Sequence, residues 1–199
     1  MTRAEMKTRA REQLGNGIFR DPWLLAMVVC LIVTLLTGLA GTVLPGLGAV
    51  LISGPLLYGQ IRLFLRQARS GLPMEVTEVF QGFRDDLGGI ILIGLLTTLF
   101  TLLWSLLLVI PGIVKSYSYA MSYYVKVDHP EYGWKACVDE SIRLMRGHKW
   151  ELFMLDLSFI GWYIVGSLCL GVGILWVTPY LAATRAQFYE SIRLLPESL

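Results

Sequence analysis

The stretch that decides the fold runs from residue 87 to residue 114 and reads LGGIILIGLLTTLFTLLWSLLLVIPGIV. It contains no Asp, Glu, Lys or Arg, and a helix needs roughly 20 apolar residues to cross a hydrocarbon core of about 30 Å. Two further stretches, 22–61 and 157–184, are also free of these residue types. Because a bilayer offers the backbone no hydrogen-bond partners, such runs predict membrane-spanning helices. We therefore expect an all-α, polytopic membrane protein.

The composition agrees with this expectation. Of the 199 residues, 55% are hydrophobic and 16% are charged, and the mean hydropathy is +0.59. A chain of this kind is neither disordered nor typical of water-soluble globules. The formal net charge of +2 is too small an excess to indicate nucleic acid. We expect membrane lipids as partners and no nucleic acid.

Glycine and proline divide each uncharged stretch into a rising and a returning half. The expected turns lie at 41–48, 111–112 and 171–173, which predicts six spans in three hairpins. The returning halves at 112–125 and 177–192 are short or polar. Each of these two segments either crosses the bilayer or lies flat at its surface.

The positive charges predict the orientation. Every Lys and Arg except Lys115 lies in the tails or between the hairpins, and the three turns contain none. Short loops rich in Lys and Arg stay in the cytoplasm, so both termini and both linkers are expected there. The linkers 73–84 and 134–146 carry apolar residues at the spacing of one helix face, which predicts cytoplasmic amphipathic helices along the interface.

The single membrane domain, 1–199, shows signs of a threefold internal repeat. The candidate units are 1–66, 73–126 and 134–193. In each unit a basic corner precedes a rising span and a turn, and a proline stands near the expected start of the returning helix. These prolines are Pro55, Pro111 and Pro179. The units are either copies of one pattern or the polar flanks and breakers that any membrane hairpin has.

Five stretches of the chain have distinctive sequences. They are FQGF at 80–83, LWSLLLVIPGI at 103–113, SIRLMRG at 141–147, LSFIGW at 157–162 and PY at 179–180. Together they resemble the domain-of-unknown-function 975 family of bacterial integral membrane proteins. More loosely, the chain is similar to the membrane domain attached to some glycerophosphodiester phosphodiesterases. The resemblance implies a multi-pass protein of the bacterial inner (plasma) membrane and supplies no activity or catalytic residue.

The returning halves are unusually polar for membrane spans. An ionisable residue near the bilayer centre costs about 2.5 kcal/mol or more, which makes Lys115 a functional candidate. If the units pack around a pseudo-threefold axis, their polar faces meet in one cavity suited to a lipid headgroup or another amphiphile. The candidate cavity residues are Tyr58, Arg62, Lys115, Tyr119, Ser122, Tyr180 and Thr184. Alternatively, Lys115 extends to the far interface and the others hold the helices together by hydrogen bonds.

Three arginines at the expected cytoplasmic boundary are candidate contacts for lipid headgroups: Arg20, Arg84 and Arg146. The anionic leaflet attracts a basic residue by roughly 1 kcal/mol. Acidic neighbours such as Asp21 and Asp85 favour the other interpretation, an ordinary corner in which arginine pairs with aspartate.

The sequence contains no constellation typical of an enzyme. With only two histidines and no Gly-rich phosphate loop, we expect no metal, no cofactor and no catalysis. One hypothesis is a module that binds or transports a lipid or small amphiphile, or a membrane subunit of a larger assembly. The other is a structural or regulatory scaffold, docking a soluble partner through the linkers 73–84 and 134–146. A protein partner or a homo-oligomer is compatible with both.

Overall fold

The computed structural model describes residues 2–15, 21–43, 47–168 and 173–194. Within these segments the chain forms nine α-helices, one 3-10 helix named η1 and no strand, so the all-α class is confirmed. The elements are α1 (Arg3–Gln13), α2 (Asp21–Val43), α3 (Leu47–Ser70), η1 (Val76–Phe83), α4 (Leu87–Leu107), α5 (Val109–Tyr119), α6 (Ser122–Asp128), α7 (Trp134–Leu144), α8 (Lys149–Leu168) and α9 (Ile174–Arg193).

Three of the described helices are long and apolar enough to cross a membrane. They are α2, α4 and α8, over Pro22–Thr42, Leu87–Leu107 and Lys149–Leu168. They overlap the rising halves of the three uncharged stretches, although α8 begins eight residues before its stretch. Much of their surface is exposed apolar side chain, as expected for helices whose solvent is lipid.

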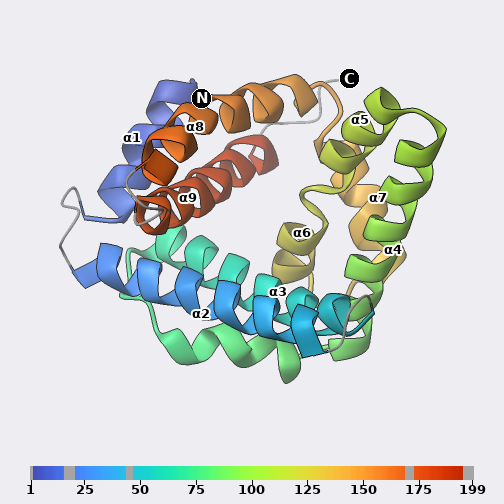
Figure 1. The fold of residues 1–199 in the computed structure, drawn as a ribbon, viewed down its shortest axis with the longest axis horizontal. Coiled ribbons are helices and arrows are strands. Elements are labelled where there is room, and N and C mark those ends of the chain that lie inside the picture. Colours follow the sequence, from blue (N-terminus) through green and yellow to red (C-terminus); the bar gives the residue numbers. More distant parts are fainter. Residues whose placement is uncertain (1, 16–20, 44–46, 169–172, 195–199) are drawn as a thin grey trace.

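The three apolar helices lie along different sides of a ring. In Figure 1, α2 runs along the lower edge, α4 along the right and α8 along the top. Each packs against the helix that follows it in the chain, α2 on α3, α4 on α5 and α8 on α9. The N-terminal helix α1 completes the ring by packing on α9.

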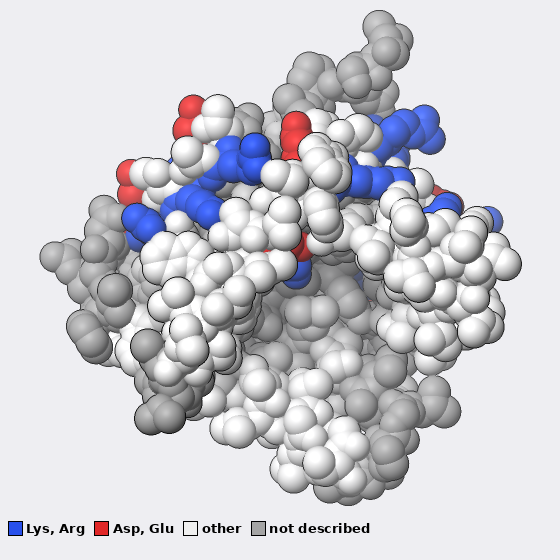
Figure 2. All heavy atoms as spheres, turned by 45° about the horizontal axis from the view of Figure 1, so that its top comes forward, with Lys and Arg blue, Asp and Glu red and all other residues white. Residues whose placement is uncertain are grey.

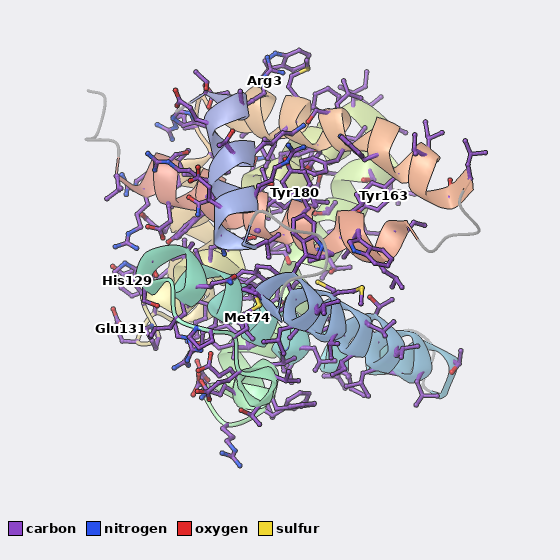
Figure 3. All side chains as sticks on the ribbon, turned by 90° about the vertical axis from the view of Figure 1, so that its left-hand side faces the viewer. Arg3, Met74, His129, Glu131, Tyr163 and Tyr180 are labelled. Atoms are coloured by element: carbon purple, nitrogen blue, oxygen red, sulfur yellow. The ribbon has the colours of Figure 1, made fainter. Side chains whose placement is uncertain are left out.

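Charge gathers at one end of the molecule. Figure 2 shows Lys, Arg, Asp and Glu in a band across the top of that view, above a hollowed face on which few charged atoms are visible. In Figure 3 most nitrogen and oxygen atoms lie toward the side of His129 and Glu131, while the far ends of α2 and α8 carry mainly carbon. The charge asymmetry expected from the sequence is thus present in three dimensions.

Two of the three returning helices do not start near proline, contrary to the sequence expectation. Pro55 lies inside α3 and Pro179 inside α9, and only Pro111 lies in the first turn of its helix, α5. A proline removes one backbone N–H, and neighbouring helices can restore the lost interactions in a membrane protein. The helices therefore continue through these positions.

The linker 73–84 differs from the predicted interfacial α-helix. It forms the short helix η1, which lies directly on α3. A Cβ on Gly59 would collide with the backbone of Val79, and one on Gly82 with the backbone of Pro55. These two glycines therefore permit a contact that the sequence pattern does not reveal. The second linker does contain the predicted helix, α7, which has its apolar side buried against the chain.

Candidate functional site

A polar cavity of about 420 Å³ lies between α5, α8 and α9. It forms where α5 ends and the chain turns toward α6. Its lining residues are Ile113, Ser116, Tyr117, Ala120, Met121, Tyr124, Leu152, Asp156 and Arg185. We call this cavity the Asp156 pocket.

The carboxylate of Asp156, on α8, accepts hydrogen bonds from side chains of two other helices. The Nε and Nη2 atoms of Arg185 donate to its two oxygens at 3.1 and 2.8 Å, a forked arrangement. The hydroxyl of Tyr117 donates to Oδ2 at 3.2 Å. Charge-assisted, bidentate bonds of this kind are among the stronger hydrogen bonds in proteins. The carboxylate therefore joins α5, α8 and α9 at the pocket.

The pair combines a partly buried acid with a more exposed base. The side chain of Asp156 is 18% exposed and that of Arg185 is 43% exposed. A guanidinium carries five N–H donors, and the bonds to Asp156 use only two of them. Arg185 can therefore hold its partner and still offer donors to a ligand in the pocket.

Aromatic packing fixes the tyrosines of the pocket. The ring of Phe153 meets Tyr117 edge-on at 5.9 Å, and the ring of Tyr189 lies 5.2 Å from that of Tyr124. Tyr117 is thereby held with its hydroxyl toward Asp156. The result is a small charged centre surrounded by apolar and aromatic walls.

None of the seven residues predicted to line a shared cavity lines the Asp156 pocket. Two of them do come together elsewhere. The hydroxyl of Tyr58 and Nη1 of Arg62 both donate to Oδ2 of Asp85, at 3.2 and 2.7 Å. They form a second cluster of tyrosine, aspartate and arginine at the corner that precedes α4.

The candidates Lys115, Tyr119 and Ser122 do not lie on one continuous helix. Helix α5 ends at Tyr119 and α6 begins at Ser122. The Nζ atom of Lys115 lies 5.0 Å from the ring centroid of Trp104, a cation–π contact. Ser122 donates to the carbonyl of Tyr119 at 2.9 Å, and the ring of Tyr119 lies beside that of Phe100.

Lys126 is buried, and it has three partners. Its Nζ atom donates to Oδ2 of Asp86 at 2.7 Å and to the carbonyls of Pro130 and Tyr132 at 2.8 Å each. The hydrogen bond from Lys126 lowers the pKa of the Asp86 carboxyl, and the backbone N–H of Gly89 lowers it further. The lysine therefore fastens the loop after α6 to the start of α4.

Tyr180 and Thr184 are buried in the packing of α9. Tyr180 lies in the interior beside α1 (Figure 3), between the rings of Trp23 and Phe159, and its hydroxyl is 3.4 Å from the carbonyl of Lys7. Thr184 donates to the carbonyl of Tyr180 at 2.7 Å. Tyr180 thus packs α9 against α1, α2 and α8, as in the alternative interpretation of the polar faces, whereas the hydrogen bond of Thr184 stays within α9.

The three predicted headgroup contacts differ in what the structure shows. Arg20 lies outside the described residues. Arg84 and Arg146 are exposed, and neither has an acidic partner among the described residues. The neighbours of Arg84 are occupied, Asp85 by Arg62 and Asp86 by Lys126.

Sequence reasoning missed Asp156, Tyr117 and the role of Arg185. The sequence did contain a signal for this pair. Asp156 and Arg185 have opposite charges and stand immediately before and after the uncharged stretch 157–184. In a helical hairpin, the residues at the two ends of such a stretch lie at the same depth in the membrane. In the part of the chain that the structure describes, no group of His, Cys, Asp or Glu could hold a metal ion.

One family model matches the chain. It is described as "Protein of unknown function (DUF975)" and matches residues 106–195, a range that contains every lining residue of the Asp156 pocket. No curated protein and no solved structure matches the chain. The family resemblance is thereby confirmed, while the looser similarity to glycerophosphodiester phosphodiesterases stays a prediction.

Proposed function

Residues 106–195 match the DUF975 family model, and from this premise we propose that the chain is a non-enzymatic membrane protein that binds or transports a lipid or another small amphiphile. The Asp156 pocket is the observation that carries the proposal. Its Arg185 and Asp156 offer both signs of charge to a polar headgroup, and residues such as Ile113 and Leu152 offer apolar walls to a hydrocarbon part. Ionisable residues within membrane segments commonly mark ligand or ion sites.

We further propose that the protein crosses the bacterial inner membrane six times, in three hairpins around a pseudo-threefold axis, with both termini in the cytoplasm. The arrangement of α2, α4 and α8 on three sides of a ring supports the threefold pattern (Figure 1). The contact of each with its following helix supports the hairpins. The concentration of Lys and Arg at one end supports the orientation.

The proposal is tested by identifying what co-purifies with the protein in nanodiscs made from bacterial lipid, using native mass spectrometry. The informative variant is the double change Asp156→Asn with Arg185→Gln, which removes both charges and leaves neither unpaired. We expect it to lose a bound amphiphile that the wild-type protein retains.

A matched control is available in the second cluster. The double change Asp85→Asn with Arg62→Gln removes the same kind of pair outside the pocket, at the corner before α4. It should retain the amphiphile. If both double variants lose it, or if neither does, the pocket is not the binding site.

The scaffold hypothesis receives less support. It requires exposed apolar faces on the two linkers. In α7 and the turn that follows it, Cys137, Val138 and Met145 are buried within the chain. In η1, Val79 is buried against α3, while Phe80 and Phe83 stay exposed. The apolar face of α7 is thus occupied by the protein itself, and of the two linkers η1 keeps large apolar side chains exposed.

A further inference from the structure

A second cavity, of about 530 Å³, lies between α2, α3 and η1, and all of its described lining residues are apolar. They are Leu36, Leu39, Ala40, Ile52, Leu56, Phe80 and Phe83. We call it the apolar groove. None of its residues belongs to the Asp156 pocket.

The position of η1 builds one wall of the groove. Contacts of Gly59 with Val79, and of Gly82 with Pro55, bring η1 onto α3, and the pair Arg66–Glu78 fastens it there. Side chains three residues apart lie on the same face of a 3-10 helix. Val79 faces α3 and is fully buried, while Phe80 and Phe83 face the groove and stay 43% and 40% exposed.

One end of the groove adjoins an available positive charge. Arg84 follows Phe83 directly, is exposed and has no acidic partner among the described residues. The two acids after it do not neutralise it, since Asp85 binds Arg62 and Asp86 binds Lys126. The lining residues that belong to α2 lie near the C-terminal end of that helix. In contrast to the end with Arg84, this part of the helix carries no charged residue.

An apolar groove with a single cation at one end is complementary to an anionic amphiphile. The described lining residues offer a headgroup no polar side chain, so the polar part should stay at the end where Arg84 lies. A free phosphate would leave the exposed phenylalanine rings uncovered. A phospholipid covers them with an acyl chain and supplies the phosphate that an arginine binds well.

We propose that the apolar groove binds one acyl chain of an anionic phospholipid whose phosphate contacts Arg84. The inference rests on the membrane location in the proposed function, but it does not depend on the Asp156 pocket. It assigns a site for a regulatory or structural lipid that is separate from the Asp156 pocket, where the proposed function places the amphiphile.

The test is native mass spectrometry of the full chain released from nanodiscs that contain equal amounts of phosphatidylglycerol and phosphatidylcholine. Arg84→Gln should lower the ratio of retained phosphatidylglycerol to phosphatidylcholine by about fivefold, the effect of one basic residue at a membrane surface. Arg146→Gln is the matched control, since Arg146 is also exposed, has no acidic partner among the described residues and lines none of the described cavities. It should leave the ratio unchanged.

A third variant tests the groove itself. Ala40→Leu adds volume to the lining and should reduce retention of both lipids. If this variant does not fold, Leu39→Trp, at an exposed lining position, is used for the same test. An unchanged ratio in Arg84→Gln, an equal loss in Arg146→Gln, or full retention in the filled groove would overturn the inference. None of these variants touches the Asp156 pocket, so the amphiphile bound there should persist if the proposed function holds.

Discussion

The same three types of side chain, a tyrosine, an aspartate and an arginine, meet at two places in the molecule. At the corner before α4 they are Tyr58, Asp85 and Arg62, and in the Asp156 pocket they are Tyr117, Asp156 and Arg185. In both clusters the carboxylate accepts bonds from the guanidinium and the phenol. The second cluster lines the Asp156 pocket, and no residue of the first lines any of the described cavities. Similar bonding thus offers a ligand site in one place and ties helices together in the other.

Removal of one charge from the Asp156 pocket should destabilise the protein. Asp156→Asn leaves Arg185 without its carboxylate, and such a loss costs ~3–5 kcal/mol for a fully buried pair. Because the side chain of Arg185 is 43% exposed, we expect a smaller loss of unfolding free energy, about 2 kcal/mol. Unfolding in detergent micelles measures it, and the double variant with Arg185→Gln should recover part of the loss. A single variant as stable as wild type would contradict the pairing.

The pair of Asp86 and Lys126 should make stability depend on acid. The pKa of the Asp86 carboxyl is lowered from its usual value of 3.8, so the unfolded chain binds the proton more readily than the folded one. The stabilisation is therefore complete above that usual pKa and is lost as pH falls through the lower folded pKa. Asp86→Asn should show a weaker decline of the unfolding midpoint from pH 5 downward. Identical pH profiles would refute this contribution.

At the scale of elements, the apolar helices were predictable and the polar connections were not. Uncharged length alone predicts α2, α4 and α8. The break between α5, which ends at Tyr119, and α6, which begins at Ser122, contains no glycine or proline that would predict it. The position of η1 depends on Gly59 and Gly82 meeting backbone far away in the sequence, and a local pattern does not encode such a contact.

The contact between η1 and α3 can be tested through its glycines. A Cβ at Gly59 or Gly82 would collide with backbone, which cannot rotate away, so Gly59→Ala and Gly82→Ala should each cost about 1–3 kcal/mol of unfolding free energy. Gly161→Ala is the control, because no atom lies within 4 Å of the added methyl group. It should be neutral or slightly stabilising in detergent. Equal stability of all three variants would show that η1 does not pack as described.

At the scale of the whole molecule, the nearly neutral net charge conceals a strong asymmetry. The sequence predicted that charge would gather at one end, and Figure 2 shows such a band. It did not predict which charges would pair. Each uncharged stretch lies between an aspartate and a basic residue, and Asp156 and Arg185 bond to each other across theirs. Arg62 binds Asp85 of the next unit, and Lys115 lies over Trp104 of its own unit, so tertiary packing decides the partners.

The orientation can be tested with single cysteines. Glu75 is exposed in the linker before η1, and Thr42 is exposed near the opposite end of α2. In intact cells a membrane-impermeant maleimide should label Thr42→Cys and not Glu75→Cys, and inverted vesicles should reverse the pattern. Labelling of residue 75 from outside intact cells would refute the cytoplasmic placement of the linker.

The most direct test of amphiphile binding is photocrosslinking from inside the Asp156 pocket. A photoreactive amino acid at Ser116, which lines the pocket, is compared with one at Leu106, which is 85% exposed on α4. Mass spectrometry of the adducts identifies what each position contacts in cells. We predict that position 116 captures one class of amphiphile, enriched over its share of the membrane, while position 106 captures lipids in their bulk proportions. Bulk proportions at both positions, or no adduct at position 116, would contradict the account.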